Sequence, residues 1–280
     1  MEHATGPARV LLILFSVIIV GQVLLAQRGK RPFIRRIPGL TAIEEAVGRA
    51  VEMGRPILTS VGLGGIDIIT LQALAIVTNV AAVAARFGQR ILLPVRNAAL
   101  VPVAEDALST AYTQNGRPDA FSDQDIVFLS GEQFAFAAGV SGLIQREKVA
   151  ATFLFGTFFA ESLIIAENAN QVGAIQVAGT PSTTQIPFFV VACDYVIIGD
   201  EFYAATAYLT RQPTLMGSLV GQDQVKMILL GLIIVGAILM SLGIPLVWNL
   251  FYDKDLPTLV DYLQPQGPIA EAMQRMQGVR

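Results

Sequence analysis

The chain has 280 residues, with 19 lysines and arginines against 22 aspartates and glutamates, so its formal net charge is −3. This balance excludes a general nucleic-acid binder, which needs a basic face. Only 15% of the residues are charged and 53% are hydrophobic, whereas ordinary soluble domains are about 25% charged. We therefore expect part of the chain to lie in lipid or in a large interface. One cysteine, Cys193, and one histidine, His3, exclude a disulfide framework and disfavour a zinc site.

The first long apolar segment is residues 10–26, which hold no charged residue and are just long enough for a membrane-spanning helix. The alternative is a cleaved signal peptide, but Leu24 would then stand where a small residue is needed before the cleavage site. A cluster of basic residues follows the segment and favours an uncleaved anchor with this side in the cytoplasm. These residues are Arg28, Lys30, Arg31, Arg35 and Arg36.

The middle of the chain predicts an α/β domain. A helix is expected from Thr41, because Thr41 and Glu44 form a capping box and apolar residues follow at helical spacing as far as Val51. A second helix is expected at 103–113, opened by Pro102. Short apolar runs bounded by turn residues predict strands at 56–61, 90–95, 125–129, 150–155 and 174–178. Alternation of strands and helices indicates a Rossmann-like layered fold with a largely parallel sheet of about five strands.

Two other stretches are apolar enough to be read as further membrane helices, residues 66–85 and 150–166. A four-span protein is therefore the alternative. We prefer to place 66–85 between the sheet and a neighbouring subunit, since a helix that is apolar all round needs burial all round. Residues 150–166 divide naturally into a strand, a turn and a helix.

A second membrane helix is predicted at 227–248, where 22 residues carry no charge and can cross the hydrocarbon layer. The basic cluster places the middle of the chain in the cytoplasm and both ends on the far side. The expected organisation has six parts. They are an extracytoplasmic N-terminus at 1–9, a membrane helix at 10–26, a basic linker at 27–40, a cytoplasmic α/β domain at 41–224, a membrane helix at 227–248 and an extracytoplasmic polar tail at 249–280.

Three parts of the chain carry a resemblance to a known family. They read EAVGRAVEMGRP at 45–56, QVAGT at 176–180 continuing with QIPFFVVACDYVIIGDEFYAATAY at 185–208, and GSLVGQD at 217–223. In these strings the chain resembles an uncharacterised prokaryotic family of membrane-anchored proteins, catalogued as a domain of unknown function. The resemblance covers most of residues 41–226. It implies a prokaryotic membrane protein, so the two predicted membrane helices are expected in the inner membrane of a prokaryotic cell. The resemblance supplies no catalytic residues.

Candidate ligand-binding residues follow the predicted strands, because ligands of open α/β sheets bind outside the carboxyl ends of the strands. Glycines after the first strand let backbone N–H groups approach a phosphate. The last residue of that turn, Asp67, would repel pyrophosphate and also suits helix capping. The candidates are Gly62, Gly64, Gly65, Asp67, Ser130, Glu132, Thr157, Glu161 and Thr180.

The sequence lacks several motifs on which common enzyme classes depend, and this limits the functions that we expect. There is no Gly-x-x-x-x-Gly-Lys loop for nucleotide hydrolysis, and the only histidine lies before the first membrane segment, away from Cys193. No catalytic residue, metal ligand or cofactor is assigned. The leading hypothesis is an oligomeric membrane-anchored scaffold or adaptor, with the lipid bilayer, copies of itself and other membrane proteins as partners. The alternatives are a small-ligand or nucleotide-sensing module that uses the glycine turn, and a carboxylate-based enzyme or transport component.

Overall fold

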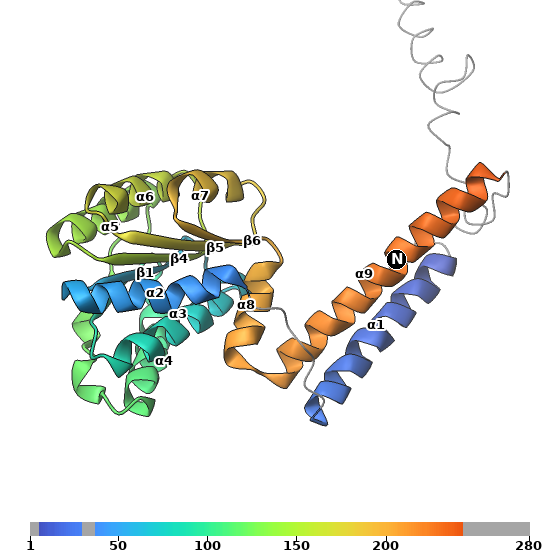
Figure 1. Cartoon of the computed structure of the whole chain (residues 1–280), viewed down its shortest axis with the longest axis horizontal. Helices are drawn as coiled ribbons and strands as arrows, with labels where there is room; N and C mark the ends of the chain where they lie inside the picture. The colour runs from blue at the N-terminus through green and yellow to red at the C-terminus, as the bar shows by residue number, and fades with distance from the viewer. Residues whose placement is uncertain (1–5, 30–36, 243–280) are drawn as a thin grey trace, which may run out of the picture. The chain divides into compact units, whose positions relative to one another are not determined.

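The structure, a computed structural model, describes residues 6–29 and 37–242. The chain separates into two compact units, one of residues 1–28 with 217–280 and the other of residues 29–216. Figure 1 shows the second unit as a sheet between helical layers and the first unit as a pair of long helices. The predicted tail at 249–280 lies outside the described residues. The same holds for residues 1–5 of the predicted N-terminus at 1–9, for residues 30–36 of the predicted linker at 27–40 and for the end of the predicted membrane helix at 227–248.

The α/β unit contains a six-stranded sheet whose neighbouring strands are all parallel. Its strands are β1 (Ile57–Gly62), β2 (Ile91–Val95), β3 (Ile126–Phe128), β4 (Ala151–Thr157), β5 (Ile175–Thr180) and β6 (Tyr195–Ile198). They lie in the order β3-β2-β1-β4-β5-β6. The chain therefore builds outward from β1 to β3, returns to β4 beside β1, and builds outward in the other direction. This is the strand order of dinucleotide-binding Rossmann folds, so the predicted fold class is confirmed.

Helices cover both faces of the sheet (Figure 1). One face packs against α2 (Pro38–Met53), α3 (Ile68–Arg86), α4 (Val101–Gln114) and α8 (Glu201–Thr210), and the other against α5 (Gln133–Glu147), α6 (Glu161–Gln171) and α7 (Ile186–Ala192). Short 3-10 turns lie at Ala98–Leu100, Pro118–Ala120 and Asp123–Asp125. Strands β1, β2 and β4 are almost entirely buried, as strands of a parallel sheet covered on both faces must be.

The structure corrects two local predictions. Helix α2 begins at Pro38, with Ile37 as its N-cap and no side-chain cap, so Thr41 and Glu44 lie within the helix and form no capping box. Proline at the first helical position lacks the N–H group that a cap would satisfy. The sheet also has a sixth strand, β6, which is absent from the predicted strands; it is a short, half-exposed run of four apolar residues at the edge of the sheet.

The two ambiguous apolar stretches both belong to the α/β unit. Helix α3 is long and apolar enough to cross a membrane by length and composition, yet half of it is buried inside the protein. It packs on the sheet with α4 and α8. Residues 150–166 divide into β4 and the start of α6, as expected.

The other unit is a pair of helices, α1 (Gly6–Gln27) and α9 (Pro213–Ser241). Both are long and apolar enough to span a membrane. Only 6% of the most apolar stretch of each helix is buried inside the protein. Helix α9 begins ahead of the predicted boundary at Met227. Gly217 and Gly221 lie so close to α1 that a Cβ atom on either would overlap its backbone. The Gln22 side chain donates a hydrogen bond of 3.0 Å to the Gln224 side chain. The contact between α1 and α9 therefore combines close packing at glycines with a polar side-chain pair.

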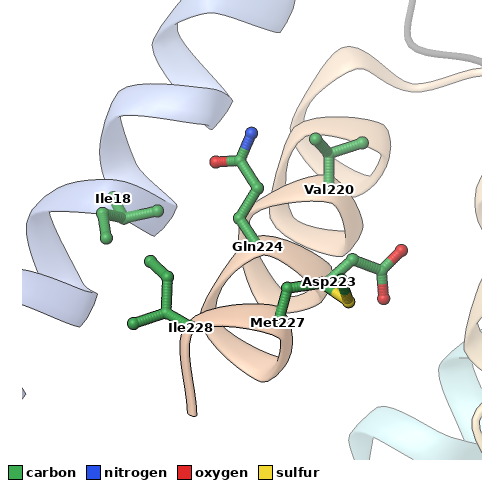
Figure 2. Close-up of a pocket in the computed structure, with 6 residues that line it drawn as sticks. All are labelled: Ile18, Val220, Asp223, Gln224, Met227 and Ile228. Atoms are coloured by element: carbon green, nitrogen blue, oxygen red, sulfur yellow. The ribbon is translucent and has the colours of Figure 1, made fainter. Parts of the chain in front are cut away.

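A groove of about 440 Å³ runs along this helix pair (Figure 2). Ile18 on α1 and Ile228 on α9 point toward the space between the helices, whereas the carboxylate of Asp223 points away from α1. The groove is therefore largely apolar, and it lies on the two helices that we predict to be in the membrane.

Candidate functional site

The parallel sheet brings all nine predicted site residues to one edge, because each follows or ends a strand at its carboxyl end. They do not form one small site. Ser130 follows β3 and Thr180 ends β5, and these strands are four spacings apart, which is roughly 19 Å at about 4.8 Å per spacing. The edge must therefore be considered in three parts: the junction of β1 and β4, the loops after β2 and β3, and the loops after β4 and β5.

The junction of β1 and β4, where a Rossmann-like sheet usually opens for its ligand, is closed. The N–H group of Leu63 donates a hydrogen bond of 2.7 Å to the carbonyl oxygen of Thr157. Gly62 and Gly156 both have positive φ, and a Cβ atom on either would overlap a carbonyl oxygen of the neighbouring strand. Leu63 and Phe158 are buried over this point. Gly62 and Thr157 therefore join two strands and do not line an opening.

Asp67 is the N-cap of α3, and its carboxylate accepts a hydrogen bond of 2.7 Å from the N–H group of Thr70. The carboxylate therefore occupies the position at which a bound phosphate would meet the helix N-terminus. Gly64 lies beside this cap, where a Cβ atom would overlap the Thr70 hydroxyl. The glycine turn consequently supports a side-chain cap, the second role that the sequence allowed for Asp67.

A second polar cluster joins the starts of α5, α6 and α7. The buried carboxylate of Glu161 accepts hydrogen bonds from the Gln133 side chain at 2.6 Å and from the N–H group of Phe159 at 2.8 Å. The Gln185 side chain donates to the carbonyl oxygen of Phe159 at 2.8 Å and also to Ser162. Each polar group thus has a partner within the cluster, which connects three loops.

The remaining predicted residues stabilise turns. The Ser130 hydroxyl accepts a hydrogen bond from the N–H group of Glu132, and the Thr180 hydroxyl accepts one from the N–H group of Ser182. Glu132 is exposed at the N-cap of α5, without a side-chain capping bond. Among the described residues, no group of three or more histidine, cysteine, aspartate or glutamate side chains is placed to hold a metal ion.

The loops after β1, β2 and β3 border an open hollow of about 420 Å³ on the protein surface, which we call the Arg96 hollow. Arg96 follows β2, and its guanidinium donates hydrogen bonds to the carbonyl oxygens of Leu63 at 2.8 Å and Gly131 at 2.7 Å. Gly64, Gly65, Asn97 and Phe128 also line the hollow. Its volume falls within the usual range for small-ligand pockets, about 300–1,000 Å³.

Comparison with models of known protein families shows which family the chain belongs to. Residues 3–251 match the family described as "Domain of unknown function (DUF6754)". The protein belongs to the DUF6754 family. No curated protein matches the chain, and no solved structure matches it. The resemblance to a family of unknown function is thereby confirmed, whereas prokaryotic origin and membrane anchoring stay predictions for this DUF6754 member.

The sequence of this DUF6754 protein places Arg96 and Asn97 directly after the predicted strand at 90–95, at the expected ligand-binding edge, but not among the nine candidates, and it does not indicate Phe128. One sequence signal points to Arg96: it is a lone basic residue directly after a buried strand, at the edge where ligands bind. Phe128 has no such signal, because an aromatic residue at the end of an apolar run usually belongs to the core. Its side chain is instead 48% exposed.

The single cysteine of this DUF6754 member is not a reactive group. Burial, with a smaller contribution from the neighbouring Asp194 carboxylate, raises the pKa of the Cys193 thiol to about 12. The thiol therefore stays protonated near neutral pH and is a poor nucleophile. Cys193 is partly buried and packs against the core beneath α5, α6 and α7, as a small hydrophobic residue does.

Proposed function

We propose that the protein is a non-catalytic, membrane-anchored scaffold or adaptor that assembles with copies of itself. In this proposal α1 and α9 lie in the inner membrane of a prokaryotic cell, and the α/β unit lies on the cytoplasmic side. One observation carries the self-assembly: the outer face of α7 and the first turn of α6 together form an exposed apolar surface without a charged residue, whereas the rest of α6 exposes polar residues.

These two helices expose five large apolar side chains, of Leu163, Ile164, Phe188, Val190 and Val191. Val191 is 87% exposed, and Glu167 is the only charged side chain that α6 and α7 expose. Exposed apolar surface with few charges is typical of the buried centre of a protein–protein interface. A second copy of the chain is the simplest partner, because a two-fold contact covers the same face on both copies.

The membrane part of the proposal is supported by the composition of α1 and α9. Their outward-facing side chains are apolar, including Val10, Leu12 and Val17 on α1 and Ile233 and Val235 on α9, each more than half exposed. In water this surface would be a liability for aggregation. In a bilayer the same side chains face hydrocarbon, and the main-chain groups of both helices are satisfied internally.

The experiment is native mass spectrometry of the full-length protein in detergent, comparing the wild type with Val191→Asp. We expect one defined oligomer for the wild type and loss of that oligomer for Val191→Asp, because a carboxylate would be buried without a partner. Phe87→Asp is the matched control: Phe87 is also exposed, at 58%, but follows α3 on the opposite face of the sheet. A monomeric wild type, or an oligomer that survives Val191→Asp, would overturn the proposal.

A second candidate function, small-ligand binding, is favoured by the Arg96 hollow. The geometry supports it at this hollow and gives less support to the glycine turn itself, since Asp67 already caps α3.

A further inference from the structure

The Arg96 hollow has the properties of a ligand site whose ligand the family does not assign; of its lining, only Gly64 and Gly65 are among the nine candidates predicted from the sequence. It lies beside the closed junction of β1 and β4 and is bordered by the loops after β1, β2 and β3. Gly64, Gly65 and Gly131 contribute no side chains, so the backbone is open to a ligand. No acidic residue is among the described residues that line the hollow.

Arg96 is held in place by neutral groups. Its Nε and Nη1 atoms donate to the carbonyl oxygens of Gly131 and Leu63, and these two bonds fix the plane of the guanidinium. Within the described ranges, Arg90, Arg117 and Arg146 each form an ion pair with a carboxylate. No carboxylate in those ranges lies within 4.0 Å of the Arg96 guanidinium, so its charge has no counterion there. A preorganised guanidinium with unused N–H groups recognises carboxylates and phosphates.

The side chains of Asn97 and Phe128 determine which other chemical groups the ligand should carry. The Asn97 side-chain oxygen accepts a hydrogen bond from the N–H group of Ala99 at 3.0 Å, so its NH₂ group is a donor for the hollow. The half-exposed ring of Phe128 gives the hollow an aromatic wall, and aromatic walls favour stacking with planar rings.

We infer that the Arg96 hollow binds a small anion that carries a planar ring, with the anionic group on Arg96 and the ring against Phe128. This inference goes beyond the scaffold function and does not depend on it. The anion meets Arg96 and not the N-terminus of α3, because the Asp67 carboxylate occupies that N-terminus. An aromatic carboxylate and a mononucleotide share this chemistry.

The test is thermal unfolding of the full-length protein in detergent, with benzoate, adenosine monophosphate and inorganic phosphate as probes. We expect benzoate or adenosine monophosphate to raise the Tm by about 5 °C at about one hundred times Kd. Phosphate, which has no ring, should raise the Tm far less at the same concentration. The probe that acts distinguishes a carboxylate from a phosphate as the anionic group.

Glycines provide matched variants that leave Arg96 and its two hydrogen bonds intact. A Cβ atom on Gly65 meets nothing within 4 Å, and the same holds for Gly131 and for Gly142 on α5. Gly65→Leu should fill the hollow and weaken binding at least about tenfold, whereas Gly142→Leu, away from the hollow, should bind as the wild type does. Gly131→Leu repeats the test from another loop if Gly65→Leu fails to fold.

Three results would overturn the inference. The first is that no probe raises the Tm of the wild type. The second is an equal rise in Gly65→Leu, Gly131→Leu and the wild type, which places binding elsewhere. The third is an equal effect of phosphate and the ring-bearing probes, which excludes the ring contact. None of these results bears on the oligomer, which is measured separately by its mass.

Discussion

At the scale of single residues, Arg90 connects three elements at the amino end of the sheet. Its guanidinium lies 2.6 Å from Asp125, which precedes β3, and 3.1 Å from Glu147 at the end of α5. The Asp125 side chain is only 7% exposed. Arg90 therefore supplies the charge that makes burial of this carboxylate tolerable.

The first prediction concerns this ion pair. Arg90→Met should lower the free energy of unfolding by about 1–3 kcal/mol, because Asp125 would stay buried without its partner. Arg117→Met is the control, since Arg117 and Asp119 are both exposed and such pairs contribute about 0–1 kcal/mol. Thermal unfolding followed by circular dichroism measures both. Equal stability of the two variants would show that Asp125 finds other partners or water.

At the scale of elements, the closed junction of β1 and β4 depends on two glycines. Gly62→Ala places a Cβ atom on the carbonyl oxygen of Thr157 and requires an unfavourable positive φ of 79°. We expect a loss of about 2–4 kcal/mol in the free energy of unfolding, from the backbone strain together with the displaced strand. Gly65→Ala, with open space around it, should change stability by less than about 0.5 kcal/mol. A Gly62→Ala variant as stable as Gly65→Ala would mean that β1 and β4 separate easily.

The sequence predicts the elements better than their arrangement. Five strands are predicted within one or two residues of their ends, because buried parallel strands form short apolar runs bounded by turn residues. β6 is also an apolar run, Tyr195–Ile198 between Asp194 and Gly199, but it is only four residues long and follows the apolar α7 after two residues, so the sequence does not separate it clearly as a strand. The position of β4 beside β1 depends on contacts between distant segments, which no local pattern encodes.

The candidate site shows the same limit. A parallel sheet alone is enough to place all nine predicted residues at one edge. Their individual roles depend on partners remote in sequence. Glu161 is buried because Gln133, 28 residues earlier, reaches it, and Arg96 is oriented by a carbonyl group 35 residues later.

At the scale of the whole molecule, the proposed membrane anchor depends on the close contact of α1 with α9. Both helices are apolar on their outer faces, so in lipid the hydrophobic effect does not hold them together, and close packing of small residues must do so. Gly221 packs directly on Ile19 of α1, whereas a Cβ atom on Gly231 of the same helix meets nothing within 4 Å. Substituting Gly221 therefore tests the contact between the helices, and the same substitution at Gly231 is the control for losing a glycine from α9.

The last prediction uses this difference. In a Cys193→Ala background, cysteines replace Ile18 and Ile228, whose side chains point into the same groove (Figure 2). A short bis-maleimide should join them in membranes. Gly221→Leu should reduce this cross-linking several-fold, because the added side chain forces α9 away from α1, and Gly231→Leu should leave it unchanged. If Gly221→Leu cross-links as well as the parent, the helices do not depend on this contact. If the parent itself does not cross-link, they do not pair in the membrane.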